Sequence, residues 1–135
     1  HLLPLIFKSV CEEDFILNVY GNDYSTKDGT CVRDYVHVKD IASAHILGLS
    51  NLEIIPNGKY NLGSSVGYTI LEVIDAVEKV TGKKVKWQFQ KRRSGDPEVL
   101  VASNALAKNE LRWEMNSSEL DKIVFDAFEW YKRAQ

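Results

Sequence analysis

The stretch from Thr69 to Gly82 constrains the fold most, because it carries a complete set of helix signals. Thr69-Ile-Leu-Glu72 is a capping box that opens a helix, and Gly82 stands where a left-handed C-terminal residue is expected. Between them, apolar residues recur at helical spacing: Ile70, Val73, Ile74, Val77 and Val80. Before the helix, Lys59 to Leu62 reads as a short strand that runs into Gly63. A strand, a turn and a helix form half of a βαβ unit, which predicts an α/β fold.

Two further segments precede this unit. Residues Val32 to Val38 alternate apolar and polar side chains, which predicts an extended segment. Asp40 can cap the helix that follows, Ile41 to Leu49. That helix has apolar residues on more than one face, so we expect it to be buried between other elements. Pro56-Asn57-Gly58 is a turn signal after it.

The C-terminal third predicts one strand, one loop and two helices. Val85 to Phe89 alternates and should be a strand with one wet face, followed by an irregular loop from Lys91 to Pro97. Ser103 to Leu111 and Ser118 to Lys132 are the two closing helices. In the second, the apolar stripe consists of Leu120, Ile123, Val124, Ala127, Phe128 and Tyr131.

Composition and charge exclude several classes of function. The chain has 135 residues, of which 44% are hydrophobic and 27% charged, enough for one ordinary core. A formal net charge of -2 gives no basic footprint, so we expect no nucleic acid partner. Cys11 and Cys31 form no CxxC and no zinc-ligand cluster, which favours a reduced, cytoplasmic compartment.

The N-terminus gives two expectations. Its apolar run is interrupted at Lys8, far short of the roughly 20 residues of a membrane span, so neither a signal peptide nor a membrane anchor is expected. The chain also opens at His1 without an initiator Met, in mid-pattern. We therefore expect further sequence upstream.

Three blocks, in order, resemble one enzyme family. They are Val19 to Asp40, Tyr60-Asn-Leu-Gly63 before the Thr69 helix, and Arg92-Arg-Ser-Gly-Asp-Pro97, and the opening His1-Leu-Leu-Pro4 agrees with them. They closely resemble UDP-galactose/UDP-glucose 4-epimerases, which are extended short-chain dehydrogenases/reductases. The resemblance implies an α/β chain, 1–135, that is the C-terminal substrate-binding portion of such an enzyme. It would hold the end of a Rossmann-type parallel sheet (about 36–82) and a small mixed α/β substrate-binding domain.

The resemblance also implies what lies elsewhere. NAD would be bound by an N-terminal portion absent from this chain, and the same portion would make the contact of a homodimer. In that mechanism NAD takes a hydride from C4 of the hexose and returns it to the opposite face. The chain shows neither the Gly-rich dinucleotide fingerprint nor a convincing Ser/Thr, Tyr, Lys catalytic set. We therefore expect no catalytic residue in it, and no epimerase activity from these 135 residues alone.

By the same resemblance, a set of residues would grip a UDP-sugar. Arg33 and Arg93 match diphosphate-facing arginines, which suit phosphate because their planar fork donates paired hydrogen bonds. Asp96 matches a ribose-contacting carboxylate, and Asn18-Val19-Tyr20 matches a stretch whose backbone reads the uracil edge, with the Tyr20 ring packed on the base. The other matched positions are Tyr35, the pair His1 and Leu2 near the phosphates, and Leu100, which would line the hexose pocket.

Simpler interpretations stand beside these. Arg33-Asp34 could be a local ion pair, Arg92-Arg93 a solubilising turn, and Tyr20 and Tyr35 ordinary half-buried aromatics. Tyr35 to Lys39 has the bare Tyr-x-x-x-Lys spacing of the superfamily's catalytic pair, but its β-branched context argues against a helix.

Two other motifs are interpreted as structural. Gly63 to Gly67 is read as a turn rather than a phosphate loop. His37, His45 and Asp40 are read as packing or surface residues rather than a metal site.

Three functional readings follow. The first is interconversion of UDP-glucose and UDP-galactose by the parent enzyme, with this chain supplying the UDP-sugar grip. The second is another UDP-sugar epimerase or dehydratase of the same superfamily. The third is a non-catalytic nucleotide-sugar-binding module.

Overall fold

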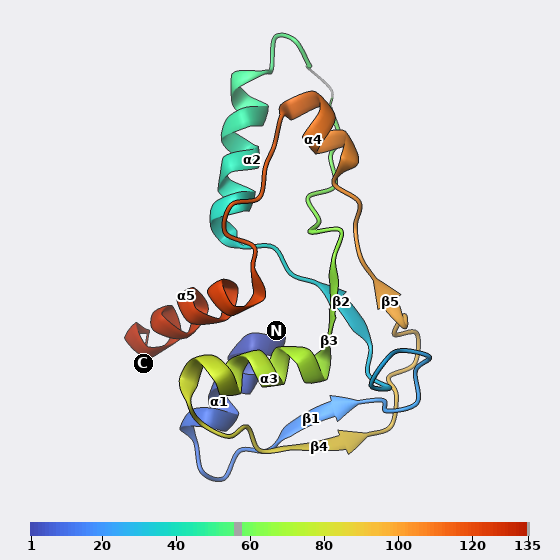
Figure 1. Ribbon diagram of the computed structural model, residues 1–135, viewed down its shortest axis with the longest axis vertical. Coiled ribbons are helices and arrows are strands. Elements are labelled where there is room, and N and C mark those ends of the chain that lie inside the picture. Colours follow the sequence, from blue (N-terminus) through green and yellow to red (C-terminus); the bar gives the residue numbers. More distant parts are fainter. Residues whose placement is uncertain (56–57, 135) are drawn as a thin grey trace.

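The computed structural model describes residues 1–55 and 58–134, and its elements follow one another as helices interleaved with short strands (Figure 1). The helices are α1 (Leu2–Cys11), α2 (Val38–Ser50), α3 (Ile70–Thr81), α4 (Ala105–Leu111) and α5 (Leu120–Arg133). The strands are β1 (Leu17–Tyr20), β2 (Val32–Asp34), β3 (Gly67–Thr69), β4 (Trp87–Gln90) and β5 (Val99–Leu100).

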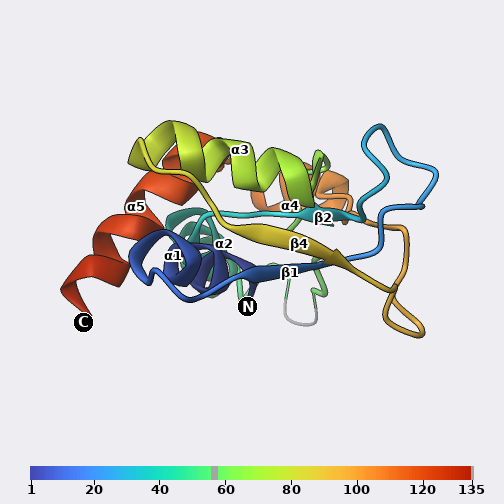
Figure 2. The ribbon, with the colours of Figure 1, turned by 90° about the horizontal axis from the view of Figure 1, so that it is seen from below.

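The strands form two small sheets. Strands β1 and β4 pair in parallel, with Leu17 opposite Trp87. In the other sheet β2 is central: it pairs antiparallel with β3 and parallel with β5, and Arg33 lies opposite both Tyr68 and Leu100. In the view of Figure 2, α3 lies along one side of these strands, whereas α1 lies beside one end of β1 and β4. Strand order and helices together give the mixed α/β arrangement expected.

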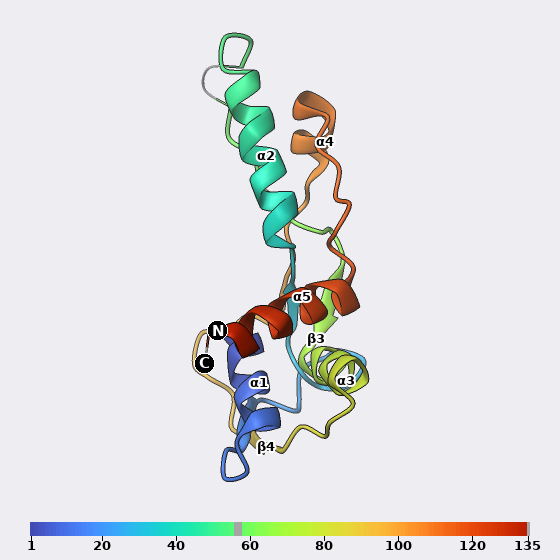
Figure 3. The same cartoon turned by 90° about the vertical axis from the view of Figure 1, so that its left-hand side faces the viewer.

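The main core lies where α1, α3 and α5 meet, as Figure 3 shows from the side. Phe7 of α1 packs against Phe128 and Tyr131 of α5, with ring centroids 5.2 and 5.5 Å apart. Val73 and Val77 of α3 are fully buried in the same cluster. The stripe expected on the last helix is confirmed, because Leu120, Ile123 and Val124 are buried and Ala127, Phe128 and Tyr131 pack at its edge.

A second, smaller cluster lies apart, where α2 and α4 extend away from the strands (Figures 1 and 3). Its centre is Trp113, whose ring is buried and whose Nε1 donates to the Asp40 carbonyl oxygen at 2.8 Å. Ala44 and Leu111 complete the centre of the cluster. Only a narrow part of α2 is covered by this packing.

The helix from residue 70 is confirmed in detail. The Thr69 hydroxyl accepts from the Glu72 N–H, and the Glu72 carboxylate accepts from the Thr69 N–H at 2.9 Å. Gly82 ends the helix with φ 68°, in the left-handed region where glycine carries no Cβ penalty. The two closing helices and the strand near Val85 are also present. The strand is shifted to Trp87–Gln90, and the expectation of one wet face is wrong, because all four of its residues are exposed.

Four expectations need correction or fall outside the description. Residues 59–62 form no strand, because no described segment pairs with their backbone. The second helix begins at Val38, and its N-cap is His37 rather than Asp40. It is also not buried between other elements, since the Ile46 and Leu49 side chains are 64% and 69% exposed. The turn at Pro56-Asn57-Gly58 lies partly outside the described residues.

Candidate functional site

A cavity of about 520 Å³ opens between the start of α1, strand β1 and strand β2. This size lies within the range of small-molecule pockets. Nine of the ten candidate residues line it: His1, Leu2, Asn18, Val19, Tyr20, Arg33, Tyr35, Arg93 and Asp96. Segments separated by more than 90 positions in the chain therefore meet around one space.

Arg33 lies in this cavity on the central strand β2, and its guanidinium forms an ion pair with Asp96. Its Nη1 also donates to the Val32 carbonyl oxygen at 2.6 Å. The alternative interpretation, a local ion pair between Arg33 and Asp34, is therefore wrong. Asp34 instead accepts from the backbone N–H of Ser64 at 2.9 Å and of Ala102 at 3.0 Å, and so fixes the end of β2.

The loop before β2 is held by a compact hydrogen-bond cluster. Asp28 accepts from the Thr30 N–H at 2.9 Å and from the Thr69 hydroxyl, and the Thr30 hydroxyl oxygen accepts from the Ile70 N–H at 3.0 Å. Burial alone raises the pKa of Asp28, but these hydrogen bonds outweigh it and the pKa is lowered. The cluster attaches the loop to the start of α3, and thereby positions Arg33.

Tyr20 and Arg93 are stacked at another wall of the cavity. Tyr20 ends β1, and the loop after β4 brings the Arg93 guanidinium to 3.9 Å from its ring centroid. Arg92, the neighbour, lies over Tyr24 at 3.8 Å and pairs with Asp23. The two arginines thus both contact aromatic rings, which a merely solubilising turn would not require.

The polar edge of β1 is formed by Asn18. Its side-chain Oδ1 accepts from Gln88 Nε2 at 3.0 Å and from Gln90 Nε2 at 3.3 Å. Val19, next along the strand, points the other way and is buried, so it anchors β1 in the core.

Tyr35 follows β2 and packs near Tyr68, with ring centroids 6.4 Å apart. Burial raises the pKa of Tyr35 to about 12. A catalytic tyrosine of the superfamily needs a lowered pKa, and Lys39 lies in α2 rather than on a helix shared with Tyr35. Both observations agree with reading the Tyr35 to Lys39 spacing as coincidental.

The rest of the cavity lining consists of two candidate residues and of further residues that the sequence did not single out as binding residues. His1 is exposed at the start of α1, whereas Leu2 packs at the edge of the core. The additional lining residues are Leu5, Phe15, Ile16, Leu17, Cys31 and Ile70. Most are apolar, and nothing in the sequence distinguished them from core residues. Burial raises the pKa of the Cys31 thiol, which makes it a poor nucleophile.

Leu100 does not line this cavity. It lies on β5 beside Arg33 and its side chain is 59% exposed. The structure therefore groups it with the strand that carries the site, but not with the other nine residues.

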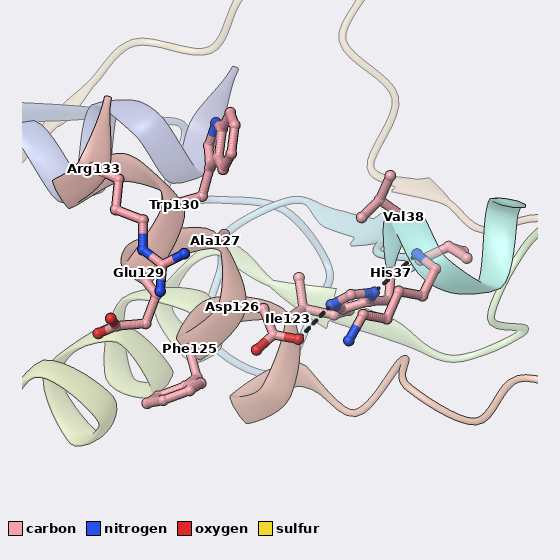
Figure 4. A pocket seen from close by; sticks show the side chains of 11 residues that line it. His37, Val38, Ile123, Phe125, Asp126, Ala127, Glu129, Trp130 and Arg133 are labelled. Carbon is pink, nitrogen blue, oxygen red and sulfur yellow. Dashed lines mark hydrogen bonds and ion pairs between the residues drawn. The ribbon is translucent and has the colours of Figure 1, made fainter. Parts of the chain in front are cut away.

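A second cavity, of about 690 Å³, lies on a different face, between the start of α2 and α5 (Figure 4). His37 and Asp126 face each other there, with Nε2 and Oδ2 3.0 Å apart. His37 Nδ1 accepts from the Lys39 N–H, so Nε2 carries the proton in the neutral ring. The bonds on both ring nitrogens give His37 a structural role, as expected.

The wall of this second cavity is strongly apolar. Phe125 and Trp130 of α5 and Val38 of α2 are exposed there, Trp130 by 72%.

Among residues 1–55 and 58–134, no group of three or more His, Cys, Asp or Glu side chains could hold a metal ion. Within the same residues, every helix is too short or too polar to span a membrane.

Comparison with known proteins identifies the proteins that this chain is similar to. Residues 1–63 match the NAD dependent epimerase/dehydratase family. The UDP-glucose 4-epimerase of Lacticaseibacillus casei is 42% identical over 133 residues, which is 98% of this chain and 40% of that protein.

Solved structures give the same result. The UDP-glucose 4-epimerase of Stenotrophomonas maltophila, with bound NAD and formylated UDP-arabinopyranose, has a TM-score of 0.93 at 38% identity, over 99% of this chain and 40% of that one. The enzyme of Bifidobacterium longum, in complex with NAD+ and UDP, has a TM-score of 0.87 at 35% identity, over 98% and 39%.

Residues 1–63 thus carry the sequence pattern of the NAD dependent epimerase/dehydratase family, and the whole chain is similar in sequence and fold to UDP-glucose 4-epimerases. It corresponds to the C-terminal portion of UDP-glucose 4-epimerases and spans about 40% of the length of the relatives it matches. Its fold is that of the C-terminal part of an extended short-chain dehydrogenase/reductase.

Proposed function

We propose that this chain supplies the UDP-sugar grip of an enzyme that interconverts UDP-glucose and UDP-galactose. The supporting observation is the cavity in which nine of the ten candidate residues meet, since these were selected for their match to UDP-binding positions. The solved relative from Bifidobacterium longum, which carries UDP, adds support at the level of the ligand class.

In this proposal the charged groups of the cavity divide the nucleotide between them. Arg33 and Arg93 bind the diphosphate through charge-assisted hydrogen bonds, and Asp96 accepts from ribose hydroxyls. The Arg33–Asp96 pair already holds both groups at one wall, so binding redistributes donors and acceptors that are preorganised. Tyr20 packs on the base. Arg93, whose guanidinium lies over the Tyr20 ring here, either moves away from that ring or stays on the ring face that the base does not contact.

The glycine-containing stretch before α3 does not have the surroundings of a dinucleotide-binding loop. This stretch, Gly63 to Gly67, leads into β3 and packs against the chain itself: a Cβ at Gly63 would meet Ala102, and one at Gly67 would meet Val32. These glycines permit close approach of chain segments, which is a structural role. We therefore assign NAD, which supplies the hydride acceptor and donor for C4 chemistry, to an N-terminal portion of the parent enzyme.

The same proposal accounts for the exposed apolar side chains. Residues about 36–82 are the last elements of a larger nucleotide-binding sheet, and the NAD-binding portion covers α2 and the unpaired segment 59–62. Ile46, Leu49 and Ile54 are more than 60% exposed on this side, which is unusual for residues of that size. Leu100 faces the hexose once that portion is in place.

Location and assembly complete the proposal. The protein acts in the cytoplasm, where Cys11 and Cys31 stay as the free thiols they are here. Any homodimer forms through the NAD-binding portion, and galactose metabolism is the process served.

Titration with UDP tests the grip. Arg33→Ala and Arg93→Ala should each weaken UDP binding by about 1.5–3 kcal/mol, because each removes a hydrogen bond to a charged group. Arg133→Ala, an exposed arginine on α5 outside this cavity, is the matched control and should bind UDP as before. Unchanged UDP affinity in both cavity variants would refute the assignment.

A further inference from the structure

The side-chain oxygen of Asn18 accepts hydrogen bonds from two neighbouring side chains of β4. Asn18 lies directly opposite Gln88 in the β1–β4 pair, and Tyr20 lies opposite Gln90, so all four side chains share one face. Both glutamines donate their Nε2 to the same Asn18 Oδ1, at 3.0 and 3.3 Å. A carbonyl oxygen has two lone pairs, and both are therefore in use.

This pairing decides which atoms Asn18 can offer to a ligand. With Oδ1 satisfied by the glutamines, the amide presents its two Nδ2 hydrogens, which are donors only. Asn18 lines the cavity, two residues before Tyr20 on the same face of β1. A ligand that reaches Asn18 must consequently present an acceptor there.

The place of the base in the cavity decides which of its edges can reach Asn18. Arg33 and Asp96 pair with each other at one wall, where the proposed function has the diphosphate and ribose. A pyrimidine is joined to ribose through N1, and the ring atom opposite N1 is C4. In the proposed function Tyr20 packs on the base, and Asn18 lies two residues before it on the same face of β1. The base edge opposite the ribose, which carries the substituent at C4, is therefore the edge that can reach Asn18.

We propose that Gln88 and Gln90 are specificity-determining positioning residues that make the site select uracil over cytosine. They act through Asn18, whose Nδ2 donates to the C4 carbonyl oxygen of uracil. Cytosine carries an amino group at C4, so two donors would face each other and neither would be satisfied. The inference rests on the proposed function, because it requires a nucleoside diphosphate in this cavity.

Two double variants and one charge control test this. Gln88→Ala/Gln90→Ala frees the Asn18 amide to rotate. Gln88→Glu/Gln90→Glu replaces both donors by acceptors, which draws Nδ2 away from the cavity and turns Oδ1 toward the base. Lys91→Glu, just after β4, changes the net charge by the same two units as the second variant and leaves Asn18 untouched. All three positions are exposed, and circular dichroism checks that the fold persists.

The measured quantity is the ratio of UDP to CDP affinity by calorimetric titration of the protein and its variants. Because it is a ratio, a general effect of charge on the diphosphate cancels. We expect UDP to bind at least about tenfold more tightly than CDP in the unmodified protein and in Lys91→Glu. The ratio should fall to within about threefold of one in the alanine pair and should invert in the glutamate pair.

The outcomes separate the two claims. Tight UDP binding with the same UDP preference in both double variants overturns the role of Gln88 and Gln90 while leaving the UDP site intact. Equal binding of UDP and CDP by the unmodified protein also overturns it. Binding of neither nucleotide refutes the proposed function, and the inference falls with it.

Discussion

Asp40 is the residue whose chemistry most directly holds two parts of the molecule together. Its Oδ1 accepts from the Asn116 N–H at 3.1 Å, and its Oδ2 accepts from the Ser117 N–H at 3.0 Å and from the Ser118 hydroxyl. Burial alone raises the pKa of Asp40, but these hydrogen bonds outweigh it, and the pKa is lowered. The start of α2 is thereby attached to the segment that leads into α5.

This geometry predicts a pH-dependent loss of stability in Asp40→Asn. At neutral pH the variant should unfold about 1–3 kcal/mol more easily, because an amide NH₂ replaces one acceptor and faces a donor. A carboxyl with a lowered pKa contributes stability above its ordinary pKa of about 3.9, and that contribution is lost as the pH falls through the folded-state value. Urea unfolding at several pH values should show the difference shrinking below about pH 4. A difference that stays constant down to that pH would contradict the assignment.

At the scale of single residues, the sequence identified polar partners poorly and cavity membership well. Arg33 pairs with Asp96, 63 positions away, rather than with the adjacent Asp34. Partner choice depends on how β2 and the loop after β4 approach each other, and no local pattern encodes that distance. The cavity members came from resemblance to a family in which that approach is already built into the motif.

Among the elements, α3 has the strongest local control of its own start. The Thr69 hydroxyl accepts from the Glu72 N–H and donates to Asp28, so one side chain caps the helix and fixes the preceding loop. We expect Thr69→Ala to lower the free energy of unfolding by about 1–2 kcal/mol, the usual loss for such a cap. Thr69→Ser keeps the hydroxyl and is the control.

The measurement is thermal or urea unfolding of both variants beside the unmodified protein. Equal losses in the serine and alanine variants would assign the effect to the lost methyl group and its packing. In that case the capping box would not control the start of the helix.

Elements with local signals were predicted, and elements that depend on distant partners were not. The capping box and Gly82 identify α3 without tertiary information, and the apolar stripe identifies α5. Strands β3 and β5 have three and two residues, and both exist because β2 lies between them. Residues 59–62 show the converse: their sequence favours a strand, but no described segment offers a partner.

At the scale of the whole molecule, several large apolar side chains lie outside the packed core, and two groups of them are found near helices. One group is on the α2 side, with Ile46, Leu49 and Ile54, and the other is on the α5 wall, with Phe125 and Trp130. Single exposed apolar residues are ordinary, but grouped ones mark surfaces that another polypeptide covers. The covered length of the relatives, about 40%, leaves a portion large enough to do so.

A chimera tests this division of labour. The N-terminal part of the Lacticaseibacillus casei enzyme, up to the start of the match, would be joined to this chain, which is 42% identical to the segment it replaces. We expect the chimera to convert UDP-galactose to UDP-glucose with NAD, because the donor part supplies NAD binding and this chain supplies the grip on UDP. The 135 residues alone, with NAD added, should give no conversion.

Arg33→Ala separates the grip from mere covering of the apolar surface. In the chimera it should raise KM for UDP-galactose by about ten- to a hundredfold, since a lost charged hydrogen bond is worth about 1.5–3 kcal/mol. The surface residues would be unaffected, so the variant chimera should elute from a sizing column as the parent chimera does. Conversion by the 135 residues alone would show that the catalytic groups are already present here. A folded chimera with an unchanged KM in Arg33→Ala would instead remove that arginine from the UDP site.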